Sequence, residues 1–367
     1  MQFKTVIGQL PAKSLLRGMA DNERIPHALL LLGAPGSGDL ALAVAFAQYV
    51  LCQYKKDGDA CGQCSQCSKV GKLVHPDLHF SFPTVGTNVI SDHHIADWRT
   101  ALAENPYLDV NQWLQRIGAE NKQGNINKEE CLSIIKKLSL KAFEGRYKIL
   151  VMWLPEYLGK EGNRLLKLIE EPPDDTLIIL VAENQELILN TILSRCQIVK
   201  VNRLSDEEVE AGLVILKGAS AEKARSIAHL AAGDFNEALS IAAQPQKDNS
   251  NLFLDWLRKC YQGNGVEMAA WTETFADLGR ENQKQFLQYA LHFMREYMLL
   301  KTTGNDQVRL LPEELKTAQN LSKIIGFGQI ERITKLFNDC SFYIERNANQ
   351  KLLFLDASIQ LNKILRA

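Results

Sequence analysis

The sequence predicts an α/β fold built on a parallel sheet, because short apolar runs alternate along the chain with stretches of helical periodicity. The first run, residues 27–32, leads into a glycine-rich loop, and a helical pattern follows from 40 to 52. Two further runs, 148–153 and 176–182, have the length and β-branched content of strands that are buried on both faces of a sheet. A last run at 196–201 closes the sheet. Strand, glycine loop and helix follow one another in the order that a phosphate-binding loop requires.

The composition changes after residue 202, where the α/β pattern ends. Ser205 is followed by three acidic residues, and a capping residue with early negative charge predicts the start of a helix. Helical periodicity continues to 243, the polar stretch 244–250 has the character of a linker, and helical patterning follows to the end. We therefore expect three domains: an α/β domain at 1–202, a small helical domain at 203–246 and a C-terminal helical domain at 247–367.

The charge balance excludes a global basic field. Lys and Arg number 42 against 43 Asp and Glu, which gives a formal net charge of −1. The chain therefore has no overall charge that would attract nucleic acid or an anionic membrane. Its first residues lack the long apolar run of a signal peptide, and no stretch has the ~18 apolar residues of a membrane span. We expect a soluble, cytoplasmic protein that does not contact a membrane.

The glycine-rich loop contains the glycines of a phosphate-binding loop but lacks its lysine and its hydroxyl residue. Gly33, Gly36 and Gly38 are in register with the pattern GxxxxGK[ST]. In that pattern the lysine neutralises the β- and γ-phosphates and the hydroxyl binds Mg²⁺. Here Asp39 occupies the lysine position and Leu40 the hydroxyl position. A carboxylate in place of the lysine repels a triphosphate, so we predict a nucleotide-type fold that binds neither ATP nor Mg²⁺.

The strand that ends near residue 153 also lacks the acidic residues of an ATPase. An active site needs an aspartate here for the Mg²⁺ shell and usually a glutamate that polarises the attacking water. Trp153 and Leu154 stand at these positions, and Glu156 follows two residues late. The substitutions therefore remove the metal ligands as well as the lysine.

Four of the eight cysteines crowd into residues 52–67, as Cys52, Cys61, Cys64 and Cys67. Two-residue gaps let neighbouring thiolates converge on one ion, and four thiolates form the closed, structural kind of zinc site. An iron–sulfur centre is the rival, but its motif needs a further Cys followed by Pro, which residues 68–75 do not supply. Four unrelated free thiols are the remaining alternative. We expect structural zinc in a reducing compartment.

Seven short segments occur in a specific order between residues 7 and 201. They are Ile7-Gly8-Gln9, His27-Ala28, the altered loop at 36–39, the four-cysteine insertion, His75-Pro76-Asp77, 163–173 and 191–196. In this order and spacing the chain resembles the delta-prime subunits of the bacterial DNA polymerase III clamp loader, which are AAA+ proteins. The C-terminal region is similar only in being helical. The resemblance implies an AAA+ fold with a zinc module, a helical lid domain and a C-terminal helical collar domain for oligomerisation.

The resemblance also implies which residues have lost a role and which one has kept it. In ATP-hydrolysing relatives the strand near residue 182 ends in a threonine that senses the γ-phosphate, whereas this chain has Ala182 and Glu183. The lid of those relatives carries an arginine where Asn236 stands. Arg195 is retained, and in clamp loaders this arginine reaches across the subunit interface to the γ-phosphate held by a neighbouring ATPase. The resemblance thus implies an arginine finger that acts in trans, the alternative being an arginine paired with a surface carboxylate.

By this resemblance the chain is a subunit that does not hydrolyse ATP. Its partners would be the gamma or tau ATPase subunits and the delta subunit in a hetero-pentamer, and through that complex the sliding clamp and primer-template DNA. It would act within the DNA polymerase III holoenzyme when the clamp is loaded onto primed DNA during replication. Two alternatives remain: an active AAA+ ATPase with an atypical site, and a zinc-dependent nucleic-acid-binding protein.

Three weaker signals favour ordinary surface structure. Lys136, Lys137 and Lys141 lie on a helix expected at 127–141, and such a charge run is more often a solvated face than a DNA contact. His93 and His94 have acidic neighbours, but an exposed polar loop is favoured over a second metal site. Residues 84–127, which contain these histidines, are polar and are expected to form a surface excursion from the sheet.

Overall fold

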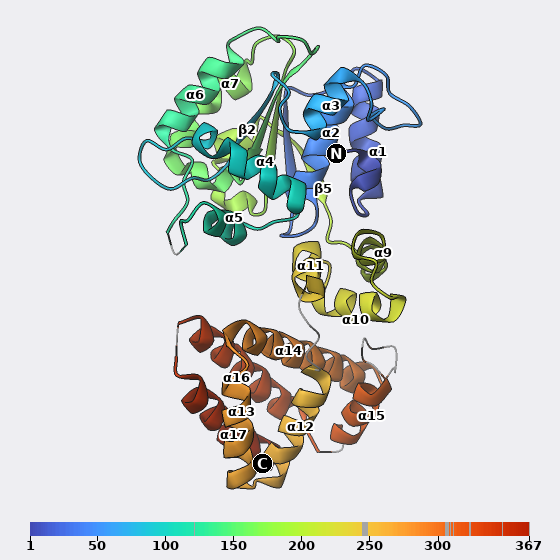
Figure 1. The fold of residues 1–367 in the computed structure, drawn as a ribbon, viewed down its shortest axis with the longest axis vertical. Coiled ribbons are helices and arrows are strands. Elements are labelled where there is room, and N and C mark those ends of the chain that lie inside the picture. Colours follow the sequence, from blue (N-terminus) through green and yellow to red (C-terminus); the bar gives the residue numbers. More distant parts are fainter. Residues whose placement is uncertain are drawn as a thin grey trace. The chain divides into compact units, whose positions relative to one another are not determined.

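The structure is a computed structural model that describes residues 1–366 except 121, 244–248, 305–307, 309, 311, 323 and 347. The chain divides into two compact units, 1–243 and 244–367 (Figure 1). Most of the predicted linker lies outside the described residues, and Asn249 already begins a helix. The further division of the first unit at residue 202 stays a prediction.

The first unit contains a five-stranded parallel sheet in the order β2-β3-β4-β1-β5. The strands are β1 (Ala28–Gly33), β2 (Leu78–Ser81), β3 (Lys148–Trp153), β4 (Thr176–Ala182) and β5 (Gln197–Val201). The α/β prediction is confirmed, and the four apolar runs form β1, β3, β4 and β5. The fifth strand, β2, is only four residues long and contains His79, so it has no continuous apolar run that could predict it.

Helices cover both faces of the sheet. One face packs against α1 (Leu10–Asp21), α2 (Asp39–Leu51) and α3 (Ser65–Gly71), and the other against α6 (Lys128–Leu138), α7 (Leu166–Glu170) and α8 (Asn190–Leu193). Along β1, Leu29 and Leu31 enter the first core and Leu30 the second, as the period of a strand requires. Burial on both faces explains why the strands are apolar at successive positions.

Residues 84–127 are not the surface excursion that their polar composition predicts. They contain α4 (Ile95–Glu104) and α5 (Val110–Arg116), which pack against the sheet through Trp98 and Trp113. The ring of Trp98 lies 4.3 Å from that of Phe82, 5.1 Å from that of Trp113 and 5.2 Å from that of Trp153. Two tryptophans thus attach to the sheet a segment whose other residues are mostly polar.

Three helices complete the first unit: α9 (Asp206–Lys217), α10 (Ala221–Ala231) and α11 (Phe235–Ala243). The predicted cap of α9 is present, because the Ser205 hydroxyl accepts from the Glu208 N–H, and the Glu208 carboxylate accepts from the Ser205 N–H. These helices lie in the segment for which the resemblance implies a lid, and that assignment stays a prediction.

The described residues of the second unit are helical, as predicted. The helices are α12 (Asn249–Gln262), α13 (Gly265–Ala276), α14 (Arg280–Thr303), α15 (Pro312–Leu321), α16 (Phe327–Glu345) and α17 (Gln350–Leu365). Trp256 anchors their core: its ring stacks on that of Trp271 at 5.2 Å, and its indole N–H donates to Ser358 Oγ at 2.9 Å.

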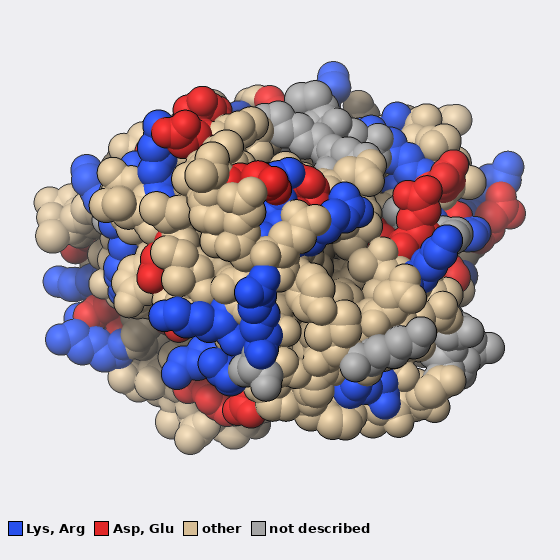
Figure 2. All heavy atoms as spheres, turned by 90° about the horizontal axis from the view of Figure 1, so that it is seen from below, with Lys and Arg blue, Asp and Glu red and all other residues tan. Residues whose placement is uncertain are grey.

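The surface carries both signs of charge. On the face drawn in Figure 2, Lys and Arg side chains are interspersed with Asp and Glu, in keeping with the near-zero net charge. Among the described residues, no helix has the length and apolar character needed to cross a membrane.

Candidate functional site

The glycine-rich loop connects β1 to α2 at the carboxyl edge of the sheet, where the sequence places it. Gly36 and Gly38 have positive φ angles of 68° and 89°, a conformation that favours glycine over residues with a Cβ atom. Asp39 is the first residue of α2. The loop therefore has the backbone that its glycines predict, and its side chains decide what it can bind.

Asp39 is buried, with only 8% of its surface exposed. One carboxylate oxygen accepts a hydrogen bond from the Leu40 N–H at 2.7 Å. Burial, with a smaller contribution from Glu156, raises the pKa of Asp39 to about 7. Near neutral pH the carboxyl group is therefore only partly ionised, so the repulsion of a phosphate is weaker than a full negative charge would give. The positive charge that would attract a phosphate is still missing.

The loop is also covered by residues from the chain itself. The Phe235 N–H at the start of α11 donates to the Gly36 carbonyl oxygen at 3.0 Å. A methyl group built on Gly36 would lie 1.8 Å from a carboxylate oxygen of Asp234, and one on Gly38 would lie 2.8 Å from the ring of Tyr107. A side chain at either position would therefore collide with Asp234 or Tyr107.

A short strap, defined as residues 105–109 between α4 and α5, holds this arrangement together. The Tyr107 hydroxyl accepts from the Ile7 N–H at 2.9 Å, and its ring lies 4.8 Å from that of Phe235. The Asn105 amide donates to the Asn236 side-chain oxygen at 2.7 Å. Asn236, which stands where the resemblance expects a lid arginine, is 6% exposed and is used in this contact. Sequence reasoning missed the strap, since its partners are distant in sequence.

The positions of the missing acidic pair are part of the core. Trp153 and Leu154 are each 2% exposed, so neither presents a polar group to the loop. Glu156, two residues beyond the position of the missing acidic pair, accepts hydrogen bonds from the N–H groups of Glu183 and Asn184 at 2.6 and 2.8 Å. It thereby caps the end of β4. Burial and then the charges of Asp39 and Glu156 raise the pKa of Glu183 to about 8. These carboxyl groups compete with one another for ionisation.

Arg195 lies on the turn that follows α8. Its guanidinium forms an ion pair with Glu170 at 3.2 Å and donates to the Thr191 carbonyl oxygen at 2.9 Å. The side chain is 32% exposed, and its Nε atom is buried without a hydrogen-bond partner in the structure. In the single chain Arg195 therefore has a surface carboxylate partner, and about a third of its side chain is exposed.

The four clustered cysteines meet in space. Cys52 follows α2, Cys64 precedes α3, and Cys67 lies within α3. The four sulfur atoms all lie within 4.8 Å of one another, close to the spacing of about 3.8 Å that a tetrahedron with Zn–S bonds of ~2.3 Å gives. The set can therefore hold one metal ion. Of the described residues, only these form such a group.

Backbone N–H groups point at the cysteine sulfurs. The Gln63 and Cys64 N–H groups donate to Cys61 Sγ at 3.5 and 3.3 Å, and the Cys67 N–H donates to Cys64 Sγ at 3.4 Å. The two donors to Cys61 lower the pKa of its thiol to about 6. Donors of this kind stabilise thiolates, which is the form in which cysteine binds metal.

The weaker sequence signals have ordinary surroundings. The Lys137 ammonium pairs with Asp92 at 2.6 Å, and His94 lies 3.5 Å from Asp97. Lys136 and Lys141 are exposed. The Lys137 contact agrees with a solvated face, but His93 and His94 lie in a short 3-10 helix, Ser91–His94, that leads into α4, and not in an exposed loop.

Comparison with known proteins adds the family context. The model of the family described as "DNA polymerase III, delta subunit" matches residues 8–205. The chain is 27% identical to DNA polymerase III subunit delta' of Escherichia coli K12, over 47% of this chain and 41% of that protein. It is 25% identical to the Bacillus subtilis subunit of the same name, over 54% of this chain and 49% of that protein. The matches thus span less than half the length of these relatives.

Two solved structures are also similar. A DNA polymerase III gamma subunit-related protein from Thermotoga maritima has a TM-score of 0.41 and 14% identity, covering 97% of this chain and all of that one. The Bacillus subtilis DNA clamp loader delta protein has a TM-score of 0.34 and 12% identity at the same coverage.

We predict that Asp39→Asn stabilises the chain in a pH-dependent way. Because folding raises the pKa of Asp39 from 3.8 to about 7, the folded chain binds the extra proton, and wild-type stability falls as the pH rises between these values. The amide variant has no such loss and keeps an oxygen that can accept from the Leu40 N–H. Its advantage in free energy of unfolding should be small at pH 4 and about 1–4 kcal/mol at pH 8.

Chemical denaturation at both pH values measures this difference. Asp174→Asn, at an exposed aspartate, is the matched control and should change stability by less than ~0.5 kcal/mol at either pH. An equal effect of Asp39→Asn at pH 4 and pH 8 would contradict the prediction.

Proposed function

The chain belongs to the DNA polymerase III delta subunit family and resembles its delta-prime members, and we propose that it is a clamp-loader subunit that does not hydrolyse ATP and supplies Arg195 in trans to a neighbouring ATPase. The observation that carries the proposal is the lysine-free phosphate loop, against which α11 packs, in a chain that retains Arg195.

Two independent features argue against hydrolysis by this chain. The groups that would bind Mg²⁺-ATP are replaced by Asp39, Leu40, Trp153 and Leu154. The start of α11 and the strap pack against the loop at Gly36 and Gly38. Either feature would weaken nucleotide binding. Together they remove the attraction of the lysine for the phosphates and restrict the loop.

Arg195 has the properties that a finger in trans requires. A guanidinium is permanently charged, and beside a transferring phosphoryl group it stabilises the charge that spreads over the phosphate oxygens. The single ion pair with partly exposed Glu170 is weak, so Arg195 can exchange this partner for a phosphate at a subunit interface at small cost. Its buried Nε still lacks a hydrogen-bond partner.

The proposed partners follow from this role. A finger in trans needs an ATP-binding neighbour, for which we propose gamma or tau subunits, with a delta subunit completing a hetero-pentamer. The helical second unit would serve as the collar that joins them. The complex would open the sliding clamp and close it around primed DNA in the cytoplasm.

We also propose that the four-cysteine module holds a structural zinc ion. Cys52, Cys61, Cys64 and Cys67 would be its ligands, and four thiolates leave no open position for catalysis. Bound zinc would supply the free energy that orders this loop-rich segment.

We predict that the isolated chain does not bind Mg²⁺-ATP at micromolar concentrations. The double variant Asp39→Lys/Leu40→Thr restores the loop residues but should also not bind, since Asp234, Phe235 and Tyr107 still cover the glycines. Calorimetric titration measures both, with an ATPase subunit of the same complex as the positive control. Micromolar binding by the unaltered chain would favour the alternative of an atypical ATPase.

We predict that Arg195→Ala leaves assembly intact and slows DNA-stimulated ATP hydrolysis by the reconstituted complex at least about tenfold, since fingers contribute roughly 10³- to 10⁵-fold in rate at a single site. Arg225→Ala is the matched control, because Arg225 is also a surface arginine paired with a glutamate. Glu170→Gln removes the partner of Arg195 within the chain and should keep full activity. If Arg195→Ala turned over at the wild-type rate, the finger would be disproved.

We predict about one zinc ion per purified chain, determined by elemental mass spectrometry. Cys64→Ser should lower the zinc content and the melting temperature, whereas Cys196→Ser, outside the cluster, should leave the zinc content unchanged. Iron and sulfide in place of zinc would support the iron–sulfur alternative, and a metal-free chain would exclude the site.

A further inference from the structure

The loop between α6 and β3 presents apolar side chains to solvent. In this loop 64% of Leu140 and 83% of Phe143 are exposed. We call residues 140–143 the apolar tip. Because Phe143 is mostly exposed, its own burial contributes little to holding the tip in place. The conformation of the tip therefore depends on the contacts of the residues that follow it.

Asp77 fixes the residues that follow the tip. Its carboxylate accepts hydrogen bonds from the N–H groups of Phe143, Glu144 and Gly145 at 2.5, 2.9 and 2.8 Å. Asp77 is 1% exposed. Burial alone would raise the pKa of this carboxyl group, but the three N–H donors outweigh it and hold the pKa below its usual value. The aspartate of the His-Pro-Asp segment thus anchors the loop by hydrogen bonds.

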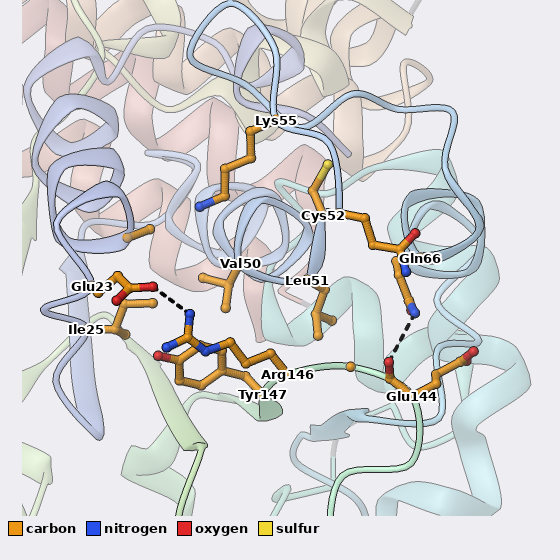
Figure 3. Close-up of a pocket in the computed structure, with 13 residues that line it drawn as sticks. Glu23, Ile25, Val50, Leu51, Cys52, Lys55, Gln66, Glu144, Arg146 and Tyr147 are labelled. Carbon is orange, nitrogen blue, oxygen red and sulfur yellow. Dashed lines mark hydrogen bonds and ion pairs between the residues drawn. The ribbon is translucent and has the colours of Figure 1, made fainter.

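His75 and Gln66 connect Asp77 to α3. His75 Nδ1 accepts from the Asp77 N–H at 3.0 Å, so its hydrogen lies on Nε2, which faces the side-chain oxygen of Gln66. The Gln66 amide in turn donates to the Glu144 carbonyl oxygen at 3.4 Å (Figure 3). One turn further along α3, the Lys69 ammonium contacts both carboxylate oxygens of Glu144 at 2.6 Å.

The same short helix contains part of the cysteine cluster. Cys64 is the N-cap of α3, and Cys67 lies between Gln66 and Lys69. A seven-residue helix is too short to be stable by itself. Its position therefore depends on tertiary contacts: Val70 packs in the core, and a metal ion bound by Cys64 and Cys67 would add a further constraint.

A cavity of about 280 Å³ separates the cysteine loop from the loop before β3 (Figure 3). Its lining includes Cys52, Gln66, Glu144 and Tyr147. The cavity leaves part of the space between the two loops unpacked. Gln66 and Lys69 of α3 reach across to the loop before β3 by contacting Glu144.

We propose that the four-cysteine module is a brace for the apolar tip, which transmits metal occupancy through Gln66 and Lys69 to residues 143–146. The brace depends on the zinc site proposed above and does not depend on the clamp-loader role. It assigns the module a task within the chain: the metal sets the conformation of a surface loop that contains none of its ligands.

Hydrogen–deuterium exchange of the full chain tests the brace. The zinc-loaded chain is compared with the same chain after chelation. Removing the metal should speed exchange of the amides at 143–146 about fivefold or more, the loss expected when one or two hydrogen bonds no longer resist local opening. Peptides from β5 should exchange at the same rate in both samples.

The double variant Gln66→Ala/Lys69→Ala tests the connection while the metal stays bound. Its zinc content should equal that of the wild type, and exchange at 143–146 should still be faster. Ser68→Ala, at an exposed residue of the same helix, is the matched control and should exchange as the wild type does. If the zinc-loaded double variant exchanged at the wild-type rate at 143–146, the brace would be disproved, whatever chelation does to the rest of the chain.

Discussion

The packing of α11 onto the phosphate loop is the contact on which the rest of the site depends. The Phe235 N–H donates to the Gly36 carbonyl oxygen, and the Tyr107 ring lies between Phe235 and Gly38. In a loop that binds nucleotide, backbone N–H groups and a lysine face the phosphates. Here the Gly36 carbonyl oxygen accepts from the start of α11, and the side-chain directions of Gly36 and Gly38 point at Asp234 and Tyr107. The loop keeps its turn, and α11 and the strap pack against it.

Burial explains why losing the lysine did not leave a charged defect. An ionised aspartate in this position would pay a large desolvation cost, and the raised pKa of Asp39 shows that the site favours the neutral acid. Glu183 responds in the same way, because it lies in the field of Asp39 and Glu156. The carboxyl edge of the sheet is therefore acidic in composition but only partly charged near neutral pH. A phosphate finds no lysine at position 39, and a divalent cation would compete with the proton of Asp39.

The sequence predicted what short-range patterns encode and missed what long-range packing decides. Continuous apolar runs identify β1, β3, β4 and β5, and cysteine spacing identifies a cluster whose sulfurs do meet. The segment 84–127 was predicted wrongly, because two tryptophans among polar residues leave no periodic signal although both are fully buried. The strap could not be predicted, since Asn105 and Asn236 are 131 positions apart in the chain. A single tyrosine between Pro106 and Leu108 gives no indication that it will pack against a glycine loop.

The loops at the two edges of the sheet are held in place by different kinds of contact. A bound nucleotide would stabilise the carboxyl edge only by an amount that depends on its concentration relative to its dissociation constant. The strap and α11 are part of the chain, so the contacts that replace the nucleotide do not vary with ATP concentration. At the amino edge, Asp77 holds the loop before β3 by hydrogen bonds, and the proposed metal would add a constraint through the cysteine module. By these proposals the chain would respond to the metal at one edge and be independent of nucleotide at the other, which suits a subunit whose proposed contribution to hydrolysis is an arginine for its neighbour.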